Sequence, residues 1–361
     1  MEPKVIEYPI PGNEKGGILH IFGEKTSQKC ILYVGGFPDG VEPFTPMAKR
    51  LASNDCYVGV TCFPGFDFGR YNANKPGSNY RREGYRFEEV VLAVREAASQ
   101  LFGEYNKTDG KHFEYKNPSY TLILHDWGTV PGAMYANQVI ADKELTISKR
   151  TLFTDHAPDR IVFLDVLLGP APNMMDCTKH ISRHTTREIV CYMAYRGAAA
   201  LSFLSHRVSK PIGAITYLIF GTLVQLTGLS PTRAIDNDMV GARITSFGRL
   251  SHLIYMMYPY YYMFKALVIN KKALAGAHLP TNLDKTPVLF LYGADKNVTF
   301  NDRRGMAVLE KQPGCRVAKV DGAGHWLYCQ KPDVVEKEIT SFISKGGESG
   351  VSSATAKTSK L

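Results

Sequence analysis

The segment over residues 120–140 constrains the fold of this chain more than any other. A short apolar run over residues 120–124 leads into the turn His125-Asp126-Trp127-Gly128, and residues of helical character follow at once. The pattern predicts a buried strand over residues 120–124 and a helix over residues 129–140, with small residues at Gly128 and Gly132 that let the helix approach the strand closely. A sharp turn between strand and helix holds its central side chain up at the carboxyl edge of a sheet.

The rest of the chain repeats this alternation of strands and helices. Two segments at residues 5–10 and 17–22 resemble paired antiparallel strands. The periodicity predicts further strands at 29–34, 56–62, 160–168, 287–292 and 316–320, and helices at 43–53, 84–102 and 332–344. This order predicts an α/β fold, a mostly parallel central sheet with helices on both faces. The apolar share of 44% excludes a disordered or collagen-like chain.

The alternation stops between residues 169 and 284, where the pattern is helical and rich in tyrosine. We therefore predict a core over residues 1–168 and 285–345, a helical cap inserted at 169–284, and a flexible tail at 346–361. Within the cap, residues 211–232 carry no charge. Two interpretations stay open for that segment: a buried cap helix, which we favour, or a helix that dips into a membrane surface.

The two ends and the charge indicate location and partners. The polar tail ends in Ser359-Lys360-Leu361, which matches the peroxisomal import address, so we expect a peroxisomal protein that binds the import receptor. The first residues contain no apolar signal segment. The net charge of +9 is spread thinly, so nucleic-acid binding is not expected.

Two residues suggest chemistry. Asp126 occupies the centre of the predicted turn, where a carboxylate can attack carbon and form an ester, although it could also merely cap the following helix. His325, in Gly322-Ala-Gly-His-Trp326, follows the last short strand and precedes the final helix, where a partner base is expected. We found no phosphate loop, dinucleotide motif or convincing metal-ligand set, so neither a cofactor nor a metal is implied.

The motifs around these residues resemble those of the α/β-hydrolase superfamily, and within it the epoxide hydrolase and haloalkane dehalogenase branch. They are His-Asp-Trp-Gly at Asp126, Gly-x-Gly-His-Trp at His325, and Gly-Gly-Phe-Pro-Asp at residues 35–39. Gly35 departs from this pattern, because the family usually has histidine there. The resemblance implies that the backbone N–H groups of Phe37 and Trp127 form an oxyanion hole.

The acid that would complete a catalytic triad has two candidates. The resemblance implies an acid at Lys296, and the nearest carboxylate is Asp295, one position earlier. Asp165, at the end of the strand that follows the Asp126 helix, is the alternative, because a charge within an apolar strand is costly without a partner. Either acid could orient the imidazole of His325.

The resemblance also implies two cap tyrosines that bind the departing epoxide oxygen. Residues 191–196 and 255–262 supply early and late clusters, from which we select Tyr195 and Tyr261. An aromatic run of this kind can equally reflect packing alone. The prediction is that at least one tyrosine of each cluster faces Asp126.

These expectations together describe an epoxide hydrolase-like enzyme that opens a small apolar, lipid-like epoxide to a diol through an ester on Asp126. A haloalkane dehalogenase would share that nucleophile but commonly has asparagine at the position of Phe37. A catalytically inactive binding protein with the same fold is the third interpretation, because Gly35 and Lys296 both depart from the family pattern.

Overall fold

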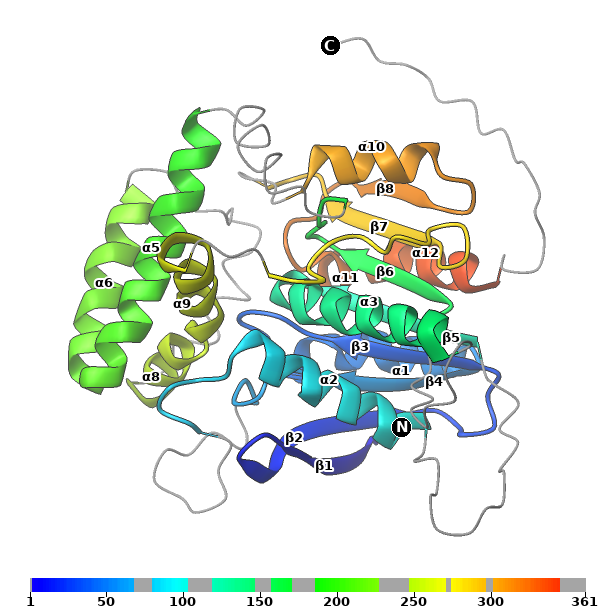
Figure 1. Cartoon of the computed structure of the whole chain (residues 1–361), viewed down its shortest axis with the longest axis horizontal. Coiled ribbons are helices and arrows are strands. Elements are labelled where there is room, and N and C mark those ends of the chain that lie inside the picture. The colour runs from blue at the N-terminus through cyan, green and yellow to red at the C-terminus, as the bar shows by residue number, and fades with distance from the viewer. Residues whose placement is uncertain are drawn as a thin grey trace.

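The computed structural model describes residues 2–67, 80–102, 119–146, 157–170, 186–226, 247–270, 274–296 and 301–344. Its centre is an eight-stranded sheet with the order β1-β2-β4-β3-β5-β6-β7-β8 (Figure 1). The strands are β1 (Lys4–Ile10), β2 (Asn13–Phe22), β3 (Lys29–Val34), β4 (Cys56–Thr61), β5 (Ser119–His125), β6 (Arg160–Leu164), β7 (Val288–Gly293) and β8 (Arg316–Val320). β1 and β2 pair antiparallel and β2 is antiparallel to β4, while all other neighbours are parallel. This confirms the predicted fold class.

Helices cover both faces of the sheet. α2 (Phe87–Phe102) and α3 (Thr129–Thr146) pack together on one face, and α1 (Thr45–Ser53), α11 (Leu327–Gln330) and α12 (Pro332–Ser344) lie on the other. A short η1 (Glu42–Phe44) precedes α1, and α10 (Arg303–Lys311) packs beside β8. The inner strand β4 is buried along its whole length, as expected for a strand of a sheet that helices cover on both faces.

Two predicted boundaries are corrected. The strand expected over residues 160–168 ends at Leu164, because Asp165 adopts a left-handed backbone conformation with φ of 71°, which takes the chain out of the extended region. The helix expected from residue 84 begins at Phe87, because Gly84 has φ of 66° and belongs to the preceding turn. The tail at 346–361, with its targeting tripeptide, lies outside the described residues, so the peroxisomal location stays a prediction.

The helices of the predicted cap lie between β6 and β7 in the chain. They are α5 (Thr186–Val208), α6 (Lys210–Leu226), α8 (Phe247–Tyr255), α9 (Tyr258–Phe264) and the π-helical η4 (Lys265–Ile269). Figure 1 shows them grouped at one end of the sheet, with α9 between the sheet and α5 and with α6 outermost. α9 therefore brings late-cap side chains toward the carboxyl ends of β3 and β5.

The buried cap helix predicted over residues 211–232 is wrong for the described part of that segment. Among the residues of α6 whose burial the structure describes, only Gly213 and Ala214 are buried, and the large aliphatic residues face outward. The reason is its position, because α6 is packed through one side on α5 and α8, and no other described element forms a layer over it. Among the described residues, no helix has both the length and the apolar character to cross a membrane.

Candidate active site

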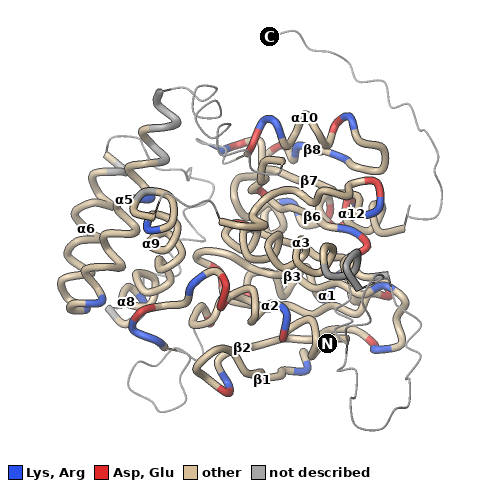
Figure 2. The backbone as a smooth tube through the Cα atoms, in the orientation of Figure 1, with Lys and Arg blue, Asp and Glu red and all other residues tan. Residues whose placement is uncertain are grey.

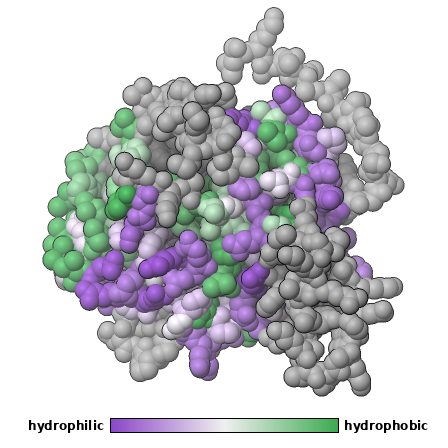
Figure 3. All heavy atoms as spheres, viewed as in Figure 1, coloured by the Kyte–Doolittle hydropathy of each residue, from purple (hydrophilic) through white to green (hydrophobic). Residues whose placement is uncertain are grey.

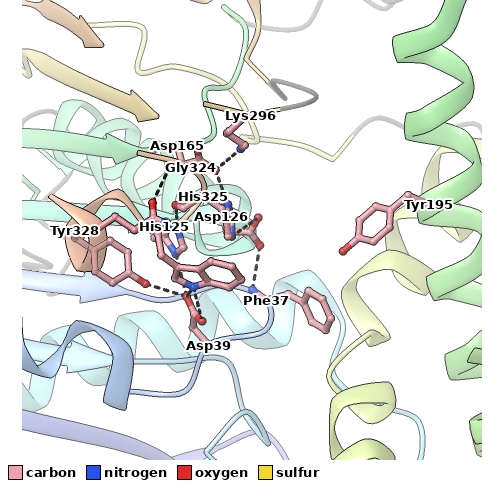
Figure 4. Close-up of polar contacts among 12 residues, drawn as sticks. Phe37, Asp39, His125, Asp126, Asp165, Tyr195, Lys296, Gly324, His325 and Tyr328 are labelled. Atoms are coloured by element: carbon pink, nitrogen blue, oxygen red, sulfur yellow. Dashed lines mark hydrogen bonds and ion pairs between the residues drawn. The ribbon is translucent and has the colours of Figure 1, made fainter. Parts of the chain in front are cut away.

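Asp126 stands at the turn between β5 and α3. Its φ is 50°, in the left-handed region, a conformation that costs a non-glycine residue about 1–3 kcal/mol and is concentrated at functional sites. Gly128 lets this turn sit directly on β3, because a Cβ there would overlap the carbonyl oxygen of Val34. The Asp126 carboxylate does not simply cap its own helix. Its Oδ1 accepts a hydrogen bond of 3.0 Å from the backbone N–H of Phe37, in the loop after β3 (Figure 4).

His325 lies in the loop between β8 and α11 and connects two carboxylates. Its Nε2 is 3.6 Å from Oδ2 of Asp126, and its Nδ1 is hydrogen-bonded at 2.5 Å to Oδ2 of Asp165. Burial alone would lower the pKa of His325, but Asp165 and then Asp126 outweigh burial and raise it. The imidazole can therefore accept a proton on the side that faces Asp126.

The two candidate acids are now distinguished by position. Asp165 is fully buried, and its backbone N–H donates to the carbonyl oxygen of Leu291 at 2.7 Å, which fixes the turn that aims its carboxylate at His325. Asp295 is half-buried in the turn after β7, where its backbone N–H donates to Ala323. Because Asp165 occupies Nδ1 of His325, the structure pairs the imidazole with Asp165 and not with Asp295.

Lys296 is a site residue whose part sequence reasoning missed. It is buried, and its ammonium donates to the same carboxylate oxygen of Asp165 that binds His325 (Figure 4). Burial would raise the pKa of Asp165, yet Lys296 and His325 together hold it well below its usual range. The sequence did offer a signal, since Lys296 occupies the position where the resembled family has an acid. What the sequence could not reveal was that the lysine reaches across to Asp165.

A second buried carboxylate supports the loops around the site. Asp39 accepts hydrogen bonds from the indole N–H of Trp326 at 3.0 Å and from the hydroxyl of Tyr328 at 2.9 Å. His125 lies between this carboxylate and the loop that carries His325, with Nδ1 at 3.2 Å from Asp39 and Nε2 at 3.2 Å from the backbone oxygen of His325. These contacts tie the loop after β3 to the loop that carries His325. They agree with a supporting role for His125.

The tyrosine prediction needs one correction. Tyr195 of α5 does point its hydroxyl toward Asp126 (Figure 4), and it is hydrogen-bonded at 2.8 Å to the hydroxyl of Tyr260, not of Tyr261. Neighbouring residues of a helix point about 100° apart, so only one of the two can face the sheet. Tyr261 instead packs on Phe203, with ring centroids 5.7 Å apart.

Both inward-facing tyrosines are protonated at neutral pH. Burial, together with the nearby negative charge of Asp126, raises the pKa of Tyr195 and that of Tyr260 well above the ordinary tyrosine value. A neutral phenol that faces a carboxylate can donate a proton or a hydrogen bond to a substrate held between them.

Aromatic rings form the apolar wall beside these groups. The ring of Tyr260 contacts Trp127 edge-on at 4.7 Å, Phe37 at 5.3 Å and Tyr195 at 5.4 Å between centroids. The guanidinium of Arg196 lies 5.2 Å from the Trp127 ring. Gly36 allows this assembly, since a Cβ there would overlap the backbone nitrogen of Trp127. The loop that carries the Phe37 N–H is thereby held against the Trp127 N–H, where the predicted oxyanion hole would lie.

One cluster in the described residues has the ligand spacing of a metal site. It consists of His125, Asp165 and His325, with candidate ligand atoms within 4.8 Å of one another. Oδ2 of Asp165 is already engaged by His325 and by the ammonium of Lys296, and a second cation beside that ammonium would be repelled. The cluster is therefore better explained as a hydrogen-bonded relay, by which we mean Lys296, Asp165 and His325 joined through Oδ2 of Asp165.

Comparison with known sequences gives one partial match. No protein-family model matches the sequence. One curated protein, described as "Putative esterase/lipase" from Haemophilus influenzae, is 32% identical over 60 residues. That match covers 17% of this chain and only 21% of the relative.

Solved structures match over nearly the whole chain. An epoxide hydrolase from Bacillus megaterium superposes with a TM-score of 0.56 at 18% identity, covering 94% of this chain and 100% of its own. A haloalkane dehalogenase variant from Bradyrhizobium elkanii gives 0.53 at 16% identity, covering 95% and 97%. An epoxide hydrolase from Vigna radiata gives 0.52 at 14% identity, covering 95% and 98%. The chain has the α/β-hydrolase fold, similar to that of these two kinds of hydrolase.

Proposed function

We propose that this protein is a hydrolase that opens an apolar epoxide to a diol through an ester on Asp126. The observation that carries the proposal is the arrangement around one carboxylate. Asp126 has the buried His325–Asp165 pair on one side and the hydroxyls of Tyr195 and Tyr260 on the other. A nucleophile, a base with its orienting acid, and proton donors for the leaving oxygen are the groups that this reaction requires.

In the first step, a carboxylate oxygen of Asp126 attacks a ring carbon and forms an ester bond while the ring carbon–oxygen bond breaks. The departing oxygen takes a proton from the Tyr195–Tyr260 pair, which is why neutral tyrosines suit this position. The aromatic walls favour an apolar substrate.

In the second step, Nε2 of His325 takes a proton from water and the resulting hydroxide attacks the ester carbonyl. Asp165 stabilises the imidazolium that forms, as the raised pKa of His325 indicates. The backbone N–H of Phe37, which already binds the resting carboxylate, and that of Trp127 would stabilise the tetrahedral oxyanion. The ester carbon–oxygen bond then breaks, and the departing alkoxide takes the proton of the added hydroxyl, which gives the diol and restores the Asp126 carboxylate. The imidazolium proton returns to the tyrosine pair.

Dehalogenation is the second candidate function, because the nucleophile and Trp127 would serve it equally and one structural neighbour is a haloalkane dehalogenase. The tyrosine hydroxyls that face the Asp126 carboxylate favour an epoxide as the substrate, because they can donate a proton to its oxygen. Where a dehalogenase commonly has asparagine for the halide, this chain has Phe37, whose ring packs on Tyr260. A protein that only binds a ligand would not need the close contacts of His325 with Asp165 and Asp126.

The test is a trapped intermediate. In a His325→Gln variant the first step should proceed while ester hydrolysis stalls, so one equivalent of styrene oxide should become attached and turnover should cease. Intact-mass measurement should show an increase equal to the mass of the epoxide, and peptide mapping should locate it at Asp126.

The matched control is Asp126→Asn in the same His325→Gln background, which should acquire no adduct. Bromobutane tested in parallel separates the two chemistries, because bromide release with no epoxide adduct would identify a dehalogenase. Absence of any adduct from both reagents in a folded protein would contradict the proposed nucleophile.

The tyrosine pair yields its own prediction. Tyr195→Phe and Tyr260→Phe should each slow ester formation by about 10²-fold, and the double variant by up to about 10⁴-fold, because the leaving oxygen loses its proton donors. Single-turnover measurement of ester formation checks this. The control is Tyr261→Phe, one residue along the same helix but packed on Phe203, which should stay within about threefold of the parent rate. Equal losses at Tyr260 and Tyr261 would contradict the assigned roles.

A further inference from the structure

We propose that the outer face of the α5–α6 hairpin docks on the surface of a lipid bilayer that carries anionic headgroups. The described residues include seventeen exposed large apolar side chains, and twelve of them, five on α5 and seven on α6, lie on this hairpin. Figure 3 shows the resulting apolar surface over α6. We call it the outer cap face. Scattered apolar residues are normal on a protein surface, whereas a contiguous group of this kind marks an interaction site.

On α6, five of the seven exposed residues form one continuous stripe. They recur at intervals of three or four, which places them on a single side of the helix: Ile212, Ile215, Ile219, Leu223 and Leu226. Each is between 49% and 79% exposed. On the opposite side Gly213 and Ala214 are buried, and Tyr217 and Gly221 are partly buried. α6 is thus attached along its length and can offer only its flank to a partner.

On α5 a parallel stripe continues the surface. It consists of Val190, Met193, Gly197, Leu201, Leu204 and Val208, again at intervals of three or four. A Cβ at Gly197 would have no atom within 4 Å, so the stripe is open at that point too. Gly213 brings the two helices into close contact, since a Cβ there would lie 2.5 Å from that of His206. The two stripes therefore lie on helices that are in direct contact.

The charge of the cap helices is mostly basic. The described cap segments 186–226 and 247–270 contain seven charged residues, of which Glu188 is acidic and six are basic: Arg187, Arg196, Arg207, Lys210, Arg249 and Lys265. Lys210 lies in the chain between exposed Val208 and exposed Ile212, and Lys265 shortly precedes exposed Leu267. In Figure 2 the coloured parts of the cap helices carry blue positions, whereas blue and red positions are mixed over the core.

This combination selects a bilayer over a second copy of the chain. Two copies that met through this face would oppose their basic residues, which disfavours association. An anionic bilayer surface instead offers acyl chains to the apolar stripes and phosphate or carboxylate groups to the lysines. An apolar helix flank with basic residues beside it typically lies in the headgroup plane, with its apolar side inserted by about 5–10 Å.

The test is flotation of the full-length protein with vesicles of phosphatidylcholine, alone or mixed with phosphatidylserine. The parent protein should float with the mixed vesicles, and Ile215→Gln/Ile219→Gln/Leu223→Gln should weaken binding by at least about tenfold, because it removes the inserted side chains. The matched control is Leu92→Gln/Val334→Gln, which changes two equally exposed apolar residues outside the cap and should bind as the parent does.

Two further measurements define the binding mode. Lys210→Gln/Lys265→Gln should reduce binding to mixed vesicles about severalfold, because it removes two positive charges that attract the headgroups. Added salt should have the same effect, because it screens that attraction. An Ile219→Trp variant should show a blue-shifted emission on vesicles, and native Trp127 and Trp326, both buried, supply a constant background.

The proposal is overturned if the parent protein fails to float, or if the triple variant and its control bind equally. It is also overturned if light scattering shows a dimer that the triple variant dissociates, since a second copy would then occupy the face. Circular dichroism of each variant verifies folding. No readout depends on catalysis, so the result is independent of the proposed epoxide chemistry.

Discussion

Asp126→Asn should lower epoxide turnover by at least about 10⁴-fold, because every step of the proposed reaction passes through its carboxylate. The amide keeps an oxygen that can accept the Phe37 N–H, and it nearly matches the acid in shape, so the turn after β5 should persist. The loss should therefore appear in kcat, with little change in thermal stability. Steady-state hydrolysis of styrene oxide and a thermal melt measure the two quantities.

Asp159, which precedes β6 and contacts the amino end of β5, supplies a control for this variant. Asp159 accepts a hydrogen bond of 2.9 Å from the backbone N–H of Tyr120, much as Asp126 does from Phe37, but at the amino end of β5 and far from His325. Asp159→Asn should keep its activity within about threefold of the parent. Comparable turnover in Asp126→Asn and the parent would remove Asp126 from the reaction and favour its interpretation as a structural residue.

Asp165→Asn should lower turnover by about 10⁴-fold, because the imidazole loses the acceptor that holds its tautomer and stabilises its protonated form. In the trapped-ester assay, ester formation should survive and ester hydrolysis should fail, since His325 acts in the second step. Single-turnover kinetics with styrene oxide separate the two steps.

Lys296 affects the stability of the Asp165→Asn variant, and a second substitution at Lys296 can restore it. In Asp165→Asn the buried ammonium of Lys296 would lose its countercharge, which typically costs about 3–5 kcal/mol of stability. The double variant Asp165→Asn/Lys296→Met removes the charge as well and should recover most of the stability while staying inactive. Asp295→Asn, close in the chain but outside the relay, should remain within about threefold of the parent rate. A large loss in Asp295→Asn with none in Asp165→Asn would reverse the assignment.

Much of the fold could be predicted because it depends on local pattern. The apolar strand, the turn at Asp126 and the small residues at Gly128 are adjacent in the chain, so their geometry follows from neighbouring residues. The same holds for the short strand before His325. Both motifs end strands of one parallel sheet, and carboxyl ends of parallel strands meet at one edge, so the meeting of Asp126 with His325 was also predictable.

The parts that could not be predicted depend on rotation or on distant contacts. A shift of one residue on α9 decides between Tyr260 and Tyr261, and twenty tyrosines with similar surroundings leave that register unresolved. Likewise, the uncharged stretch at 211–226 is equally apolar whether it is buried or exposed. Its exposure depends on whether another layer covers it.

The sequence by itself therefore determined the order of strands and helices, the turn that carries Asp126 and the loop that carries His325, because each depends on residues close in the chain. Only the tertiary structure decided that Asp165 rather than Asp295 binds His325, that Lys296 joins them, and that Tyr260 faces Tyr195. These outcomes depend on contacts between residues 65 to 160 positions apart, whose energies follow from side-chain direction and burial in the folded protein.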